Sequence, residues 1–462
     1  MAASHWYTGE STQTTACVVV RSASTETIDV VANGVTLQAS CNTSVNDGNA
    51  RVDFTGLQPG SSYAYTVGGV AGGTLRTAPA DGAYPFWVAL SSCWNLPAID
   101  TIAMRLIESP PAGLVGWQWD MLREMTANLR AMFGMGDLAY KNISGTTNGY
   151  PLILVTGGTY ANAILPDTHR NYWRSQGQAA GIRELMRSVP TYRLKDDHDY
   201  DPDNACYSLT WLDASFPATA PHNQSQLDAY WSATSSTWRE WALGNPTRTL
   251  ASDYYKVRLG NVEIFCTDLI HERNYHGDTD GAGKRMISAE QEGQLLADLG
   301  NSTAPFKVWV STKQFISSIG RNSDGWYNTG GATAKGYQTQ LQRILSDSRF
   351  PRAGCLSVTG DEHVKSDMWV ADGRFGGAHA AISQISAGPA TIAVITDPDD
   401  GLVYRDGVLN KERDTSSAAR HGDNNYVLLR VLGDRVERYV LGTRCGLVYR
   451  GYVGAADNTV RK

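Results

Sequence analysis

Short apolar runs of strand length recur over positions 1–78, and clusters of Ser, Asn and Gly separate them from polar positions. Runs such as "TACVVVRS", "TIDVVANG" and "ARVDFTGL" are strand-like in length and composition. We therefore expect an all-β sandwich domain over residues 1–78.

A turn signal, "QPG", leads into a strand in which Tyr63, Tyr65 and Val67 alternate. This arrangement resembles the tyrosine-corner strand of fibronectin type III-like sandwiches. The segment that follows, "AGGTLRTAPADGAYP", ends in small residues and proline. Because such residues favour irregular connections, we expect a linker over 79–84 and a second domain over 85–462.

The pattern changes from residue 85 onward. Apolar runs of strand length alternate with longer segments of helical character, such as 121–133 and 288–299. That alternation predicts an α/β architecture. The segment 141–165 is expected to be a loop.

Several apolar runs of this second domain stop at polar residues. In open α/β sheets, ligands bind just beyond the carboxyl ends of the strands. We therefore expect the side chains that follow these runs to converge on one crevice. They are Cys93; Asp137 and Tyr140; Asp196, Asp197 and His198; Asp268; Lys313 and Gln314; and Asp361 and His363.

These residue types suit a pair of metal ions. Hard cations prefer carboxylate oxygens, and borderline ions accept imidazole or thiolate. Two ions about 3.5–4 Å apart need a carboxylate that bridges them. Asp137, Asp197, Asp361 and His363 meet that requirement. Each residue alone also has an ordinary explanation as a turn, a cap or a buried thiol, and their shared position at strand ends favours the metal site.

The acidic run "LKDDHDYDPDN" (194–204) could also be a calcium loop or a solvated turn. Asp197, Asp199, Asp201 and Asp203 alternate as in an EF-hand. The sixth position is Pro202 instead of Gly, and the twelfth is Ser208 instead of Glu, so the EF-hand is excluded. We expect Asp197 to be a ligand, Asp196 to support it, and Asp199, Asp201 and Asp203 to lie in a turn or at the surface.

Composition narrows the function further. The net charge of −6 and the lack of a Lys/Arg run argue against a nucleic-acid-binding surface. No stretch approaches the roughly 20 apolar residues of a membrane span. The N-terminus lacks the basic and apolar regions of a signal peptide. Seven cysteines without a CxxC exclude a zinc ribbon and leave disulfides undecided.

Taken together, "SSC", "GDLAY", "DDHD" and "GDEH" resemble, in order, the motifs of the alkaline phosphatase D branch of the calcineurin-like metallophosphoesterases. The resemblance implies a four-layer sandwich of two mixed β-sheets flanked by helices, after a small N-terminal β-sandwich. It also implies a Fe³⁺/Ca²⁺ centre, with other divalent ions possible. The implied iron ligands are Cys93, Asp137, Tyr140 and His363. Asp137 would bridge to calcium, which Asp197 and Asp361 would also bind.

The same resemblance implies hydrolysis of phosphate monoesters, diesters or both, by a hydroxide or oxide that bridges the metals. Asp137 would be catalytic. His198 would be either the general acid or an orienter of a carboxylate, and Arg273 either a phosphate-binding residue or an exposed residue in a surface pair. The substrate would be a small or polymeric phosphate ester. The family is mostly exported, which implies an extracellular or periplasmic location; without a signal peptide, a complete chain would be cytoplasmic.

The chain departs from the family at three places. Ile270 stands where the family usually has Arg, Asn204 replaces a usual pair of Asn, and Lys313 has no assigned role. A purple acid phosphatase-like enzyme is an alternative, although "GNH" and "GHxH" are absent. A phospholipase D-like phosphodiesterase and a non-catalytic glycan- or cell-wall-binding protein are the others. The oligomeric state is left open.

Overall fold

The computed structural model describes most of the chain. The described residues are 3–93, 106–107, 116–138, 145–147, 150–152, 160–176, 179–200, 204–315, 325–326, 335–361, 367–370, 382–386, 425–442, 446–456, 458 and 460–461. Tyr140 and His363, two of the predicted iron ligands, lie outside them, as do Asp201, Asp203 and Cys445.

Two antiparallel sheets form the N-terminal region, in the orders β1-β2-β5 and β4-β3-β6-β7. Their apolar side chains alternate inward and build a separate core that includes Val18, Val30 and Tyr65. The Tyr63 hydroxyl accepts a hydrogen bond from the Gln58 backbone N–H at 2.8 Å, which ties the start of β6 to the preceding turn. The elements are β1 (His5–Ser11), β2 (Ala16–Arg21), β3 (Glu26–Ala32), β4 (Val35–Cys41), η1 (Asn46–Gly48), β5 (Asn49–Phe54), β6 (Ser62–Val67) and β7 (Val70–Arg76).

The expected linker, 79–84, contains no helix or strand. It is nevertheless tied to the second region, because Asp81 pairs with Arg258 at 3.3 Å and the Gly82 N–H donates to Asn261 at 2.9 Å. The predicted domain bounds, 1–78 and 85–462, and the fibronectin type III-like assignment stay predictions.

The second region contains two mixed sheets. The larger runs β12-β9-β8-β19-β20-β21-β22, in which β8, β9 and β12 are parallel. The other runs β13-β14-β15-β16-β18-β17, in which β14, β15, β16 and β18 are parallel. The strands are β8 (Phe86–Ser91), β9 (Leu129–Met135), β12 (Thr191–Leu194), β13 (Tyr255–Leu259), β14 (Val262–Cys266), β15 (Phe306–Ser311), β16 (Cys355–Thr359), β17 (Asp367–Val370), β18 (Ile382–Ser386), β19 (Asn425–Val431), β20 (Arg435–Gly442), β21 (Gly446–Gly454) and β22 (Val460–Arg461).

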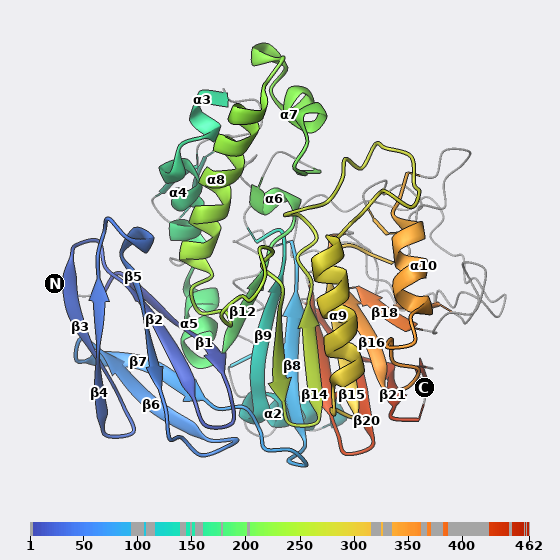
Figure 1. Ribbon diagram of the computed structural model, residues 1–462. Helices are drawn as coiled ribbons and strands as arrows, with labels where there is room; N and C mark the ends of the chain where they lie inside the picture. Colours follow the sequence, from blue (N-terminus) through green and yellow to red (C-terminus); the bar gives the residue numbers. More distant parts are fainter. Residues whose placement is uncertain are drawn as a thin grey trace.

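Helices cover the outer faces of both sheets (Figure 1). On β8, Val88 and Leu90 face the other sheet while Trp87 packs under helices, so both faces of the strand are buried. The larger sheet is covered by α2 (Trp117–Asn128), α4 (Pro166–Gln176), α5 (Ala180–Ser188) and α8 (Gln224–Trp241), and the other by α9 (Ala289–Asn301) and α10 (Gln338–Ser346). The predicted four-layer α/β sandwich after an N-terminal all-β region is therefore confirmed.

The N-terminal sandwich packs directly on the second region. The Tyr7 hydroxyl donates to the Trp241 carbonyl at 2.8 Å, and the Tyr65 hydroxyl donates to the Arg187 carbonyl at 3.1 Å. The guanidinium of Arg193 lies 4.1 Å from the centre of the Tyr7 ring. Because α5 packs on β1 and β7 and leads into β12, the sandwich supports the strand that precedes the acidic run.

Two expectations about local structure need correction. The predicted helix over 121–133 ends at Asn128, and β9 begins at Leu129, because a strand buried on both faces shows no alternation that separates it from a helix. The expected loop at 141–165 contains β10 (Gly145–Thr147), β11 (Tyr150–Leu152) and α3 (Tyr160–Ala163). The expected helix at 288–299 is confirmed as α9.

The short elements α6 (Asp197–Tyr200), α7 (Leu209–Ser215) and η2 (Pro217–Thr219) precede α8. In Figure 1, α6 lies beyond the ends of the central strands. No helix among the described residues is long and apolar enough to cross a membrane.

Candidate metal centre

Four carboxylates meet at the carboxyl ends of the parallel strands. Asp137 follows β9, Asp196 and Asp197 follow β12, and Asp361 follows β16. One oxygen from each lies within 4.8 Å of one oxygen from each of the others, and all but Asp361 are fully buried. The structure therefore brings together residues from both sheets, up to 224 positions apart in sequence (from Asp137 to Asp361). Asp196, expected only to support the site, lies within the cluster.

The backbone is strained at the strand ends that deliver these groups. Cys93, Asp137 and Asp361 have φ values of 58°, 53° and 64°, in the left-handed region that non-glycine residues seldom adopt. Such conformations cost about 1–3 kcal/mol each and occur preferentially at functional sites. Each of the three turns its side chain out of a strand at the same edge of the sheets.

Two glycines let the strand ends approach closely. A Cβ atom on Gly136 would lie 2.5 Å from the Cβ of Asp196, and one on Gly360 would lie 2.8 Å from the Cβ of Ser92. Both distances are shorter than any normal carbon–carbon contact. Packing therefore requires glycine at positions 136 and 360, because any larger residue would overlap with Asp196 or Ser92 in the neighbouring loops.

Cys93 is a buried free thiol beside the carboxylates. Its Sγ lies 3.5 Å from Asp137 Oδ2 and 3.8 Å from the Asp361 carbonyl oxygen. A sulfur and a carboxylate at this separation can both reach one metal ion. Cys17, Cys41, Cys206, Cys266 and Cys355 are also free and buried, so the described cysteines form no disulfide.

Lys313, which the sequence left without a role, places its ammonium in the cluster. Its Nζ lies 2.6 Å from Asp197 Oδ1, 2.8 Å from Asp361 Oδ1 and 3.3 Å from Asp196 Oδ2. The side chain is completely buried. A buried ammonium requires such partners, because an unpaired charge is very costly away from water.

The charges in the cluster shift the pKa values of the two adjacent aspartates in opposite directions. Burial and the carboxylates of Asp197, Asp137 and Asp361 raise the pKa of Asp196 well above its usual range, against the opposing effect of Lys313. Burial alone would also raise the pKa of Asp197, but the ammonium of Lys313 holds it well below its usual range. The two neighbouring carboxyl groups are thus shifted in opposite directions, and Lys313 favours the ionised form of both.

Asp199 holds the loops of the site together. Its two carboxylate oxygens accept the backbone N–H groups of Leu138 and Asp196, each at 2.8 Å. The side chain is fully buried, so the expectation of a surface position was wrong. Its position in the first turn of α6 points it inward, between the segment after β9 and the segment after β12.

His198 lies next to the cluster and is partly exposed. Its backbone N–H donates to Asp137 Oδ1 at 3.2 Å, which orients that carboxylate. The backbone N–H of Asn204 similarly donates to Asp197 Oδ2 at 2.6 Å. The backbone N–H groups of this loop thus position both carboxylates.

Asp268 lies at the same sheet edge but serves another ion pair. Lys195 Nζ is 3.1 Å from Asp268 and 2.5 Å from Asp253, and both lysine and Asp268 are buried. Asp268 also accepts the backbone N–H of Ile270 at 3.1 Å. This group ties β12 to the segment after β14, next to the metal centre.

Arg273 is buried, so its alternative role as an exposed residue in a surface pair is wrong. Its Nε donates to the Ala205 carbonyl at 2.8 Å. The positive charge is close enough to lower the pKa of Asp197, after the larger effects of burial, Lys313 and His198. Arg273 therefore adds positive charge on the side of the loop that carries Asp197.

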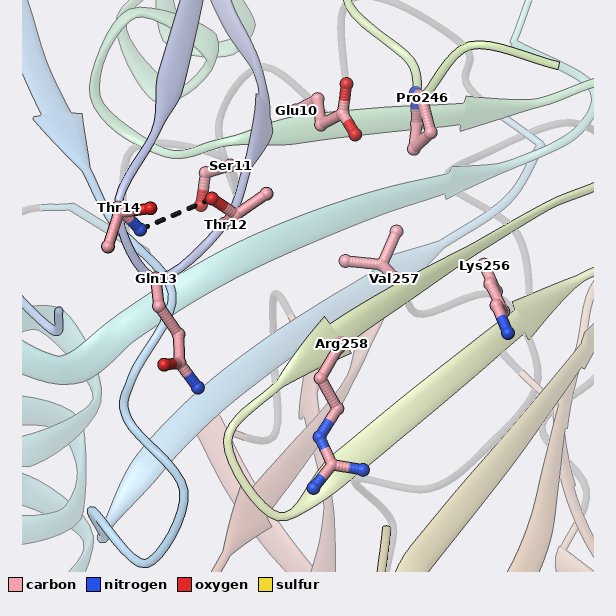
Figure 2. Close-up of a pocket in the computed structure, with 9 residues that line it drawn as sticks. All are labelled: Glu10, Ser11, Thr12, Gln13, Thr14, Pro246, Lys256, Val257 and Arg258. Carbon is pink, nitrogen blue, oxygen red and sulfur yellow. Dashed lines mark hydrogen bonds between the residues drawn. The ribbon is translucent and has the colours of Figure 1, made fainter. Parts of the chain in front are cut away.

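A cavity of about 380 Å³ lies away from this centre (Figure 2). Its walls come from the end of β1 and the turn after it, from Pro246 and from β13. Lys256 and Arg258 project from β13, Glu10 from β1 and Gln13 from the turn (Figure 2). None of the clustered carboxylates lines it, so its polar groups are separate from the candidate site.

Two mixed sheets between helical layers, with carboxylates and a thiol at the strand ends, define the architecture that was compared with known proteins. The solved structure of PhoD matches this chain with a TM-score of 0.65 at 15% sequence identity, covering 99% of this chain and 92% of PhoD. The resemblance to alkaline phosphatase D is thereby confirmed at the level of the fold. Vps29 from Entamoeba histolytica, solved with Zn²⁺, matches at a TM-score of 0.22 and 10% identity over 80% of this chain and 99% of its own, which is too weak to support an argument. No protein-family model and no curated protein matches the sequence.

Proposed function

We propose that this chain is a metal-dependent hydrolase of phosphate esters in the alkaline phosphatase D family. The observation that carries the proposal is the cluster of Asp137, Asp196, Asp197 and Asp361 beside Cys93, at the strand ends of a PhoD-like fold. Four closely spaced carboxyl groups, three of them buried, disfavour one another's ionised form, and a bound cation is the usual compensation for such an arrangement.

The donors fit the two proposed ions unequally. Cys93 and Asp137 supply a thiolate and a carboxylate, which suit Fe³⁺, and Tyr140 and His363 are the proposed further iron ligands. Asp137, Asp197 and Asp361 supply the oxygen donors that Ca²⁺ prefers. Asp197 and Asp361, however, already contact the ammonium of Lys313. The proposed ligands of the iron ion therefore suit that ion. The proposed ligands of the calcium ion do not suit it as long as Lys313 forms ion pairs with Asp197 and Asp361.

When bound, the metal would lower the pKa of a water molecule and neutralise charge on the phosphate. The protein groups would position the ester and move protons. His198, which is partly buried next to the cluster, would protonate the leaving oxygen as general acid. Arg273 would direct positive charge toward the non-bridging oxygens. The hydrogen bond from the His198 backbone N–H would keep the Asp137 carboxylate in a fixed orientation next to the metal ion.

Hydrolysis of p-nitrophenyl phosphate and bis-p-nitrophenyl phosphate tests the proposal and separates monoesterase from diesterase activity. The wild-type protein, purified from iron-supplemented cells, should hydrolyse at least one of them. Asp137→Asn should lower kcat about a thousandfold or more, because a neutral carboxamide then replaces the negatively charged carboxylate next to the metal. Asp434→Asn, whose side chain is 77% exposed, is the matched control and should keep wild-type activity.

Full activity in Asp137→Asn would contradict the proposal, as would the absence of hydrolysis by an iron-loaded wild-type protein. A preference for the diester would extend the substrate class to phospholipid and polymeric phosphodiesters. An exported location, as implied by the resemblance, is part of the proposal and is tested separately by fractionating cells.

A further inference from the structure

We propose that the ammonium of Lys313 permanently replaces the second metal ion, so that this centre binds one metal ion and does not require calcium. The inference rests on the proposed function for its context, since it concerns the same site. It departs from the two-metal centre that the resemblance implies. The residues that carry it are Lys313 and the three carboxylates that it contacts.

The ammonium lies where a second cation would have to bind. A calcium ion held by the Oδ1 atoms of Asp197 and Asp361 would compete with Lys313 Nζ, which lies 2.6 and 2.8 Å from these oxygens; Asp197 Oδ2 already accepts the Asn204 N–H at 2.6 Å. Those distances are typical of strong charge-assisted hydrogen bonds. A divalent ion cannot share the same small volume with an ammonium, because the two positive charges repel and compete for the same lone pairs.

Asp196 supports the same conclusion. Neither of its carboxylate oxygens makes a hydrogen bond among the described residues, although the side chain is fully buried. The ammonium of Lys313, at 3.3 Å, is its ion-pair partner. Lys313 thus lies within ion-pair distance of three carboxyl groups, the position that a second metal ion would otherwise take.

The backbone around Lys313 is fixed from several sides. The Ser311 hydroxyl donates to the Lys313 carbonyl at 2.6 Å, and the Gly360 N–H donates to the Thr312 carbonyl at 3.1 Å. The Phe315 N–H donates to the Gln384 side chain at 2.8 Å. These hydrogen bonds fix the backbone of a fully buried segment. The Lys313 side chain could therefore leave the carboxylates only if its charge were buried elsewhere or if the end of β15 moved.

Metal stoichiometry tests the inference without relying on catalysis. Wild-type protein, Lys313→Gln and Lys313→Arg are stripped of metal, reloaded with iron, and dialysed against labelled Ca²⁺ up to about 1 mM, the weak end of protein calcium sites. Elemental analysis then counts the ions on each chain. Lys313→Gln removes the charge and retains a polar side chain, whereas Lys313→Arg retains the charge and is the matched control.

We expect a single iron and no saturable calcium on the wild type and on Lys313→Arg. Lys313→Gln should gain saturable binding of a second ion. Activity of the wild type should be unchanged by a calcium-selective chelator. Lys284→Gln, which removes a buried lysine that donates to the carbonyls of His276 and Asp278, should gain no calcium.

Stoichiometric calcium on the wild-type protein would overturn the inference, and so would a folded Lys313→Gln variant that gains no second ion. If Lys313→Gln does not fold, the wild-type calcium content still decides. Failure of the proposed function is distinguishable from failure of this inference, since an iron-loaded protein that hydrolyses no phosphate ester can still show one ion or two.

Discussion

Replacement of Asp199 by Asn tests how the structure holds the acidic loop in place. The carboxylate accepts the backbone N–H groups of Leu138 and Asp196, each at 2.8 Å, and it is fully buried. Hydrogen bonds to a charged buried group contribute about 1.5–3 kcal/mol each. Asn keeps one acceptor oxygen and turns an NH₂ group toward the other N–H. We therefore expect a loss of about 2–3 kcal/mol in the free energy of unfolding.

The same change should reduce turnover. Leu138 follows Asp137, and Asp196 belongs to the carboxylate cluster, so both sides of the site lose an anchor. A misplacement of about 1 Å in such a site can cost roughly 100-fold in rate. We expect kcat to fall about 10–100-fold, with iron content lowered by less than in Asp137→Asn.

Urea unfolding followed by tryptophan fluorescence measures the stability, and p-nitrophenyl ester hydrolysis measures turnover. Asp434→Asn is the control, because its exposed carboxylate pairs, among the described residues, only with the half-buried Arg435, which also pairs with Glu437; the change should alter stability by less than about 0.5 kcal/mol. If Asp199→Asn behaves like this control in both assays, the two hydrogen bonds do not hold the loop, and the structural role given to Asp199 is refuted.

Two further substitutions probe packing and pH dependence. Gly360→Ala should lower the free energy of unfolding by about 1–3 kcal/mol and remove most activity, because its Cβ would lie 2.8 Å from that of Ser92. Gly293→Ala, which has open space around the added Cβ, is the control and should leave stability unchanged or slightly raised. Equal stability and activity of the two variants would contradict the packing argument. The carboxylate of Glu292 accepts two hydrogen bonds from Arg343, at 2.7 Å each, which with Gln340 lower its pKa although burial opposes this. A lowered folded-state pKa stabilises the ionised form, so Glu292→Gln should cost about 1 kcal/mol at pH 7, and the cost should begin to shrink below about pH 4.5 and be lost as the pH falls through the lowered folded-state pKa. A difference in unfolding free energy that is constant from pH 7 to pH 3 would contradict this.

The strand ends of the site were predictable because each buried run stops at a chemically distinctive residue. Parallel strands share a carboxyl edge, so Cys93, Asp137, Asp197 and Asp361 could be placed together from the order of the runs alone. The glycines before Asp137 and Asp361 were a usable signal as well. They precede residues with positive φ and leave room for neighbouring loops.

Other parts of the site depend on contacts between distant segments, which a single sequence does not record. Asp199 looked like one more acid in a charged turn, yet the N–H group of Leu138, 61 positions earlier, makes it a buried anchor. Lys313 had no motif to identify it, because its partners Asp197 and Asp361 come from other strands. The prediction of a helix over 121–133 was wrong at its C-terminal end for a local reason. The apolar run from Leu129 has no period that distinguishes a buried strand from a helix.

The most direct measurement of the central claim is an anomalous difference map at the iron absorption edge, from crystals of protein grown with iron. We predict one strong peak within coordination distance of Cys93 Sγ and an Asp137 carboxylate oxygen. A map without a peak at that position, or with iron bound only elsewhere on the protein, would contradict the assignment of these strand ends as a metal centre.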